Sequence, residues 1–177
     1  MNPEFSRPVR IDTIGGGPRS LSVTATPAER AALAARFDLL ALDRLEAELS
    51  LTRVETTIAA RGRLQAEAVQ ACVATGEPVP TVIEEEFSLL FQPPPVVNGG
   101  EDEVELGAEE LDVIFYEGSA VDVGDAVAET FALALPPFPR APAAAQALAQ
   151  AGVLSEDQAE ADKIARSPFA VLKKEAY

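Results

Sequence analysis

The stretch that decides the fold is Arg44-Leu45-Glu46-Ala47-Glu48-Leu49-Ser50-Leu51-Thr52-Arg53-Val54, in which apolar and polar residues alternate. Two further runs, at 58–72 and 81–91, repeat the alternation. Alternation places successive side chains on opposite faces of a strand, and each run exceeds the usual ~5–6 residues of a strand. The sequence therefore predicts three long antiparallel strands with one apolar face, which bend to protect that face.

Shorter segments before and after these runs also have strand character. Residues 3–14 begin with an extended segment from Glu4 to Ile11, which predicts an edge strand because Pro8 has no amide hydrogen to donate to a neighbour. Residues 19–25 alternate as a half-buried strand does, and the strand pattern returns at 111–116.

Two segments carry helix signals. Thr26-Pro27-Ala28-Glu29 fits a capping box with proline at the first helical position, for a helix that runs to about Phe37. Asp122 is the expected N-cap of a second helix, which Pro136-Pro137 ends. The expected fold class is α+β: a mainly antiparallel, strongly bent or partly closed β-sheet covered by two helices.

The composition changes twice along the second half of the chain. Residues 92–110 combine a proline run, glycines and many acids, which predicts an exposed, flexible acidic loop. Residues 140–177 are rich in alanine and predict a weakly structured tail, so residues 1–139 form the expected single domain. The tail ends in a cluster that can dock on a partner or fold back on the protein itself: Pro168, Phe169, Val171, Leu172, Lys173 and Lys174.

Charge divides the chain unevenly. The net charge is −15; residues 1–63 hold nine basic and eight acidic residues, whereas residues 64–177 hold five basic and 21 acidic residues. An acidic body repels a phosphate backbone and attracts basic partners, although the same charge also serves solubility.

Residue types that are absent exclude several kinds of chemistry. The chain has no histidine and only one cysteine, Cys72, so the sequence excludes an intramolecular disulfide, a Ser-His or Cys-His nucleophile pair and an ordinary zinc site within one chain. We expect no metal, no cofactor and no enzymatic activity. No signal peptide or membrane-length apolar run is evident, so the expected location is the cytoplasm.

Three motifs in order resemble the YceD family, the large ribosomal RNA subunit accumulation proteins. The first is a turn, Cys72-Val73-Ala74-Thr75-Gly76-Glu77-Pro78, similar to the family's Cys-x-x-Cys-x-x-Pro with Thr75 in place of the second cysteine. The second is an acidic helix motif with Asp122, Asp125, Glu129 and a closing Leu133-Ala134-Leu135-Pro136. The third is the terminal Pro168-Phe169-Ala170-Val171-Leu172, followed by two lysines.

This resemblance implies a bacterial ribosome biogenesis factor that is needed for accumulation of the large-subunit ribosomal RNA, and it brings no catalytic residues. The implied partner is a basic ribosomal protein or assembly factor, or the ribosomal RNA itself. Because Thr75 stands where the family has a cysteine, any metal role of that turn in relatives does not carry over.

Two other functions compete with a role through protein contacts. Direct RNA binding would use arginines of the first third of the chain, and a carboxylate-based hydrolase would use two of the many acids, although no pattern singles out a pair. The candidate RNA contacts are Arg7, Arg10, Arg19, Arg53, Arg61 and Arg63. The glycine cluster Gly15-Gly16-Gly17 lacks the Gly-Lys-Ser/Thr of a phosphate-binding loop. Oligomeric state has no signal in the sequence.

Overall fold

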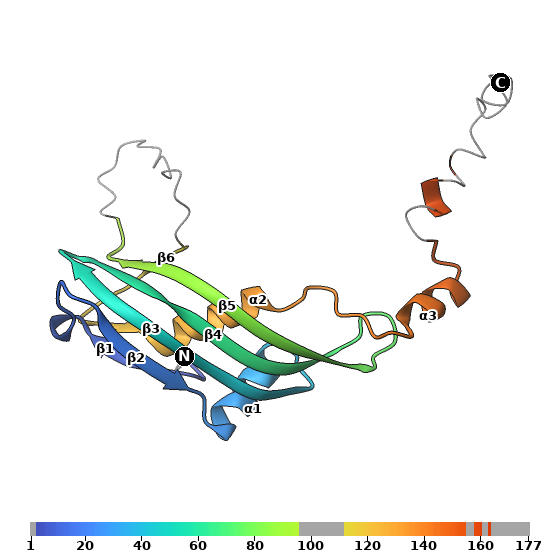
Figure 1. Ribbon diagram of the computed structural model, residues 1–177, viewed down its shortest axis with the longest axis horizontal. Coiled ribbons are helices and arrows are strands. Elements are labelled where there is room, and N and C mark those ends of the chain that lie inside the picture. The colour runs from blue at the N-terminus through green and yellow to red at the C-terminus, as the bar shows by residue number, and fades with distance from the viewer. Residues whose placement is uncertain (1–2, 96–111, 155–157, 161–162, 164–177) are drawn as a thin grey trace, which may run out of the picture. The chain divides into compact units, whose positions relative to one another are not determined.

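A computed structural model describes residues 3–95, 112–154, 158–160 and 163 (Figure 1). The chain divides into two compact units. The first comprises Met1–Gln70 and Pro80–Pro137, and the second comprises Ala71–Val79 and Phe138–Tyr177. The predicted acidic loop lies almost wholly outside the described residues, and so does the terminal Pro-Phe cluster.

The larger sheet is mostly antiparallel, as expected, and it is open, with β2 and β6 at its two edges. Adjacent strands follow the order β2-β3-β4-β5-β6. The pairs β2–β3 and β3–β4 are antiparallel, and β5–β6 is parallel. Its strands are β2 (Arg19–Thr24), β3 (Ala41–Val54), β4 (Thr57–Ala71), β5 (Pro78–Gln92) and β6 (Asp112–Phe115).

Strands β3 and β4 confirm the predicted faces. Leu45, Leu49 and Leu51 are at most 5% exposed, whereas Arg44 and Glu48 are exposed. The register is continuous from Leu42 to Val54 apart from one shift beside Asp43. The connecting turn is Glu55–Thr56, since Val54 pairs with Thr57, and Glu55 adopts a positive φ of 56°.

One glycine lets the two central strands approach closely. Gly62 pairs with Leu49, and a Cβ atom at Gly62 would lie 2.4 Å from the carbonyl oxygen of Glu48. Since real Cβ atoms do not come that near another atom, this point of the sheet requires glycine.

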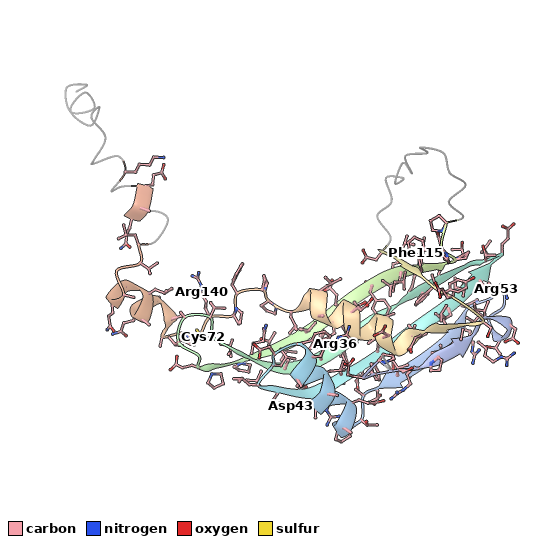
Figure 2. All side chains as sticks on the ribbon, turned by 180° about the vertical axis from the view of Figure 1, so that it is seen from behind. Arg36, Asp43, Arg53, Cys72, Phe115 and Arg140 are labelled. Atoms are coloured by element: carbon pink, nitrogen blue, oxygen red, sulfur yellow. The ribbon has the colours of Figure 1, made fainter. Side chains whose placement is uncertain are left out.

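Helices α1 (Pro27–Arg36) and α2 (Val123–Ala134) lie on the same face of the sheet (Figure 2). The predicted capping box is present, because Thr26 accepts from the amide of Glu29 and Glu29 accepts from the amide of Thr26. Leu33 from α1 and Phe131 from α2 are completely buried. These side chains and the apolar face of the sheet form one continuous core.

A second, two-stranded sheet joins the N-terminal segment to the start of α2. Strand β1 (Pro8–Arg10) pairs antiparallel with β7 (Ala120–Asp122). The observed strand is shorter than the expected segment 4–11, and a 3-10 helix, η1 (Ile11–Thr13), follows β1 at once.

The second unit contains the turn between β4 and β5 and the short helix α3 (Ala144–Gln150). Its small core is formed by Cys72, Ala141 and Ala144, with Ala74 and Val79 packed against them.

Candidate functional site

The sheet face opposite the helices carries short hydroxyl side chains and charged residues. A shallow groove of about 520 Å³ runs along Ser20, Ser22, Ser50 and Arg61. Register places Ser20 opposite Ser50 and Ser50 opposite Arg61, so these side chains form a row across three strands. Within the described part of the chain, the side chain of Arg61 makes no hydrogen bond or ion pair, which leaves its guanidinium available to a partner.

Three of the six candidate RNA-contacting arginines donate hydrogen bonds to residues of η1. Figure 2 shows one of them, Arg53, at one end of the sheet. Arg10 donates to Asp12 at 3.0 Å, Arg19 donates to the carbonyl of Thr13 at 3.2 Å, and Arg53 donates to the carbonyl of Ile11 at 3.1 Å. The hydrogen bond from Arg10 lowers the pKa of Asp12. With one carboxylate among three guanidinium groups, this cluster keeps a positive charge.

The other two candidate arginines are paired with acids. Arg7 donates to both carboxylate oxygens of Glu29, at 2.7 and 2.9 Å, and this hydrogen bonding lowers the pKa of Glu29 to about 2. Arg63 lies 3.1 Å from Glu84. The pairing of Arg7 fastens the N-terminal segment to α1 and leaves little of its guanidinium for a ligand.

The acidic helix motif connects distant parts of the first unit. Asp122 caps α2 by accepting from the amides of Gly124 and Asp125, at 3.0 and 3.2 Å. The same carboxylate accepts from the amide of Arg7 at 2.7 Å and from the hydroxyl of Ser6. A Cβ at Gly124 would lie 2.6 Å from the carbonyl oxygen of Phe5, so glycine permits this close approach.

The remaining members of that motif have different surroundings. Arg36 lies 3.0 Å from Glu4 and 3.6 Å from Asp125, and it thereby joins α1, the N-terminal segment and α2. Glu129 is exposed on α2. The carbonyl of Pro136 accepts from the side chain of Gln70 at 3.0 Å.

The turn motif is held by its own backbone and by the segment that contains Ala141. Gly76 adopts a positive φ of 73° and donates to the carbonyl of Cys72 at 2.9 Å. The Cys72 sulfur accepts from the amide of Ala141 at 3.3 Å. This hydrogen bond, assisted by one from the Thr75 hydroxyl, lowers the pKa of the thiol to about 7. Pro78 begins β5, so the turn ends where the next long strand starts.

A smaller groove of about 190 Å³ lies between α2 and strands β5 and β6, and we term it the α2–β5 groove. Its apolar residues are Phe87, Leu133 and Ala134, and Leu133 is 81% exposed. Three acidic residues, Glu85, Glu86 and Asp112, and no basic residue line it. Glu85 lies on the face of β5 that carries Phe87, whereas Glu86 follows it on the opposite face. Sequence reasoning missed this groove; the signals were the triplet Glu84-Glu85-Glu86 and a leucine outside the buried stripe of α2.

The three sequence motifs lie within the match to one protein family. The family model described as "Large ribosomal RNA subunit accumulation protein YceD" matches residues 60–174, which is more than half of the chain. The chain belongs to the YceD family. No curated protein and no solved structure matches it.

The YceD match covers the turn motif, the acidic helix motif and the α2–β5 groove. It begins after β3, so Arg7, Arg10, Arg19 and Arg53 lie before it. The YceD description links the chain to the accumulation of large-subunit ribosomal RNA.

Two observations of the described residues concern metals and membranes. Within 3–95, 112–154, 158–160 and 163, no group of three or more Cys, His, Asp or Glu side chains is arranged to hold a metal ion. No helix in that same part of the chain is both long and apolar enough to span a membrane.

Proposed function

We propose that this chain is a cytoplasmic, non-catalytic binding protein that the cell needs for accumulation or maturation of the large-subunit ribosomal RNA. The observation that carries the proposal is the match to the YceD family over residues 60–174. The charge of the chain supports a binding role, because 21 of its 29 acidic residues follow residue 63 and form an acidic body that attracts basic proteins.

The proposed partner is a basic ribosomal protein or an assembly factor. Residues 168–174 are the proposed second contact, because Phe169 and Leu172 can fill apolar pockets and Lys173 and Lys174 give a basic end to an acidic protein. Pro168 restricts the backbone and so lowers the entropy lost when the segment is ordered on a partner.

Removal of the gene from its host tests the function. We expect the amount of large-subunit ribosomal RNA to fall relative to small-subunit ribosomal RNA, and free large subunits to fall in a sucrose gradient. A plasmid that carries the wild-type gene should restore both. An unchanged ratio of the two ribosomal RNAs would contradict the proposal.

Direct contact with RNA is the second candidate function, and the convergence of Arg10, Arg19 and Arg53 around η1 favours it. Guanidinium groups bind phosphates with good geometry. Crosslinking in cells tests it: replacement of the three arginines by glutamine should abolish crosslinks to ribosomal RNA. Crosslinks that persist in this triple variant would exclude the cluster as the RNA contact.

A further inference from the structure

The α2–β5 groove combines exposed apolar side chains with a rim of acidic residues. Leu133 has the largest exposed fraction of the large apolar side chains in the described part of the chain, at 81%. Phe87 and Ala134 lie beside it and are half-buried. A lone exposed leucine is ordinary. Leu133, however, lines a groove together with Phe87, and the two side chains form an apolar surface that a partner side chain can contact.

The carboxylates of this rim differ from several acids elsewhere in the first unit that pair with arginines. Glu29, Glu46 and Glu84 each pair with an arginine. Glu85, Glu86 and Asp112 have no ion pair among the described residues. Glu129, one helical turn before Leu133 on the same side of α2, is also unpaired within the described chain. No basic residue of the described chain therefore neutralises the negative charge around the groove, and this charge attracts cations.

The size of the groove restricts what can occupy it. At about 190 Å³ it is smaller than the ~300–1,000 Å³ of pockets that enclose drug-sized ligands, but it accommodates one large side chain. The rim repels the phosphates of RNA. Its charge complements a peptide that carries lysine or arginine on both sides of a bulky apolar residue.

We propose that the α2–β5 groove is the binding site for a basic peptide segment of a ribosomal protein. One bulky apolar side chain of that segment lies between Phe87 and Leu133. Its lysines and arginines pair with Glu85 and Asp112. This inference rests on the proposed function for the identity of the partner class, whereas the chemistry of the segment follows from the groove alone.

Peptide binding to the full chain tests the groove directly. The probe is a fluorescein-labelled synthetic peptide with one Phe between two Lys-Arg-Lys runs, and a second peptide has Ser in place of the Phe. We expect the Phe peptide to bind wild type about tenfold more tightly in fluorescence anisotropy, because only it places an apolar side chain on Leu133. Equal affinity of the two peptides would overturn the proposal.

Variants separate the two parts of the groove. Leu133→Ser should weaken the Phe peptide about tenfold and the Ser peptide less than about twofold. The combined change Glu85→Gln and Asp112→Asn should weaken both peptides about tenfold. These residues are exposed, so circular dichroism and the melting temperature should stay as in wild type.

Matched controls lie elsewhere on the same unit. Val82 is 74% exposed on β5, and Glu48 is an exposed, unpaired acid on the sheet face opposite the helices. Val82→Ser and Glu48→Gln should leave the affinity within about twofold of wild type. If Glu48→Gln weakens binding as much as the groove variants do, overall charge explains the binding and the proposal is wrong.

Two further outcomes would also overturn it. In the first, a synthetic peptide of residues 166–177 binds more tightly than the Phe peptide, and Leu133→Ser abolishes that binding. The occupant of the groove would then be a segment of this chain. The other is an RNA oligonucleotide whose binding depends on Leu133. Failure of the peptide assay leaves the effect of gene removal on ribosomal RNA untouched, so the groove and the proposed function can fail separately.

Discussion

Asp122 and Arg7 are joined directly: the Asp122 carboxylate accepts a hydrogen bond from the Arg7 backbone amide at 2.7 Å. The same carboxylate caps α2 through the amides of Gly124 and Asp125. One side chain therefore begins a helix and holds a segment that lies 115 positions away in the sequence. The acidic residue of the family motif thus has a structural task, separate from any contact with a partner.

Asp122→Ala should lower the free energy of unfolding by about 1–3 kcal/mol. The change removes the cap of α2 and also leaves the Ser6 hydroxyl and the Arg7 amide without their acceptor. Asp122→Asn keeps an acceptor oxygen and should cost about half as much. Urea denaturation monitored by circular dichroism measures both. A loss below about 0.5 kcal/mol for the alanine variant would show that the shared hydrogen bonds contribute little.

Gly124→Ala should also destabilise the protein, although alanine in an open helix stabilises by up to about 1 kcal/mol relative to glycine. The added Cβ would lie 2.6 Å from the Phe5 carbonyl oxygen and 2.8 Å from the Arg7 amide nitrogen, so the segment 5–7 before β1 must move. We expect a cost of about 1–3 kcal/mol. Gly16→Ala is the matched control, because its nearest neighbour is 4.0 Å away, and it should stay within about 0.5 kcal/mol of wild type.

Local periodicity was enough to predict the large elements. The alternation through β3, β4 and β5 gave their faces, and the capping signals at Thr26 and Asp122 gave the starts of both helices, because these features depend on neighbours in the sequence. The predicted faces hold from Leu45 to Leu51, where every second side chain is buried.

Contacts between distant segments were beyond such reasoning. Arg7 was a candidate RNA contact from the sequence, but its pairing with Glu29 depends on how the N-terminal segment crosses α1. Likewise, the α2–β5 groove exists only because α2, β5 and β6 meet, and no sequence period brings Leu133 to Phe87. The sequence position of a charged residue does not show whether its side chain pairs with another residue of the same chain or is free to contact a separate molecule.

The Arg7–Glu29 pair should weaken in acid. The pKa of Glu29 falls from its usual 4.5 to about 2 in the folded protein, because Arg7 donates hydrogen bonds to the charged form. Its contribution to stability is therefore complete above about pH 4.5 and is lost as the pH falls toward about 2. A double-mutant cycle with Arg7→Gln and Glu29→Gln, measured by urea denaturation, should give a coupling energy that shrinks through this range. A coupling energy that stays constant down to about pH 2.5 would contradict the assignment.

The register of β3 predicts opposite effects at adjacent positions. Leu49→Ala should cost about 2–5 kcal/mol, because Leu49 is only 5% exposed in the core. Glu48→Ala should stay within about 0.5 kcal/mol of wild type, since the side chain is exposed and unpaired in the described structure. Similar losses at the two positions in chemical denaturation would mean that the strand faces are assigned wrongly.

Removal of residues 166–177 should separate association from folding. If Phe169 and Leu172 dock on a partner, the truncated protein keeps its melting temperature and no longer sediments with large ribosomal subunits in a sucrose gradient. The double variant Phe169→Ser and Leu172→Ser should reproduce this loss, because it removes the two large apolar side chains and keeps the length and charge of the segment. Glu175→Gln, which lies beyond the cluster, is the control and should sediment as wild type does. A fall in the melting temperature by more than about 4 °C would instead show that the segment belongs to the folded domain, and docking on a partner would then be rejected.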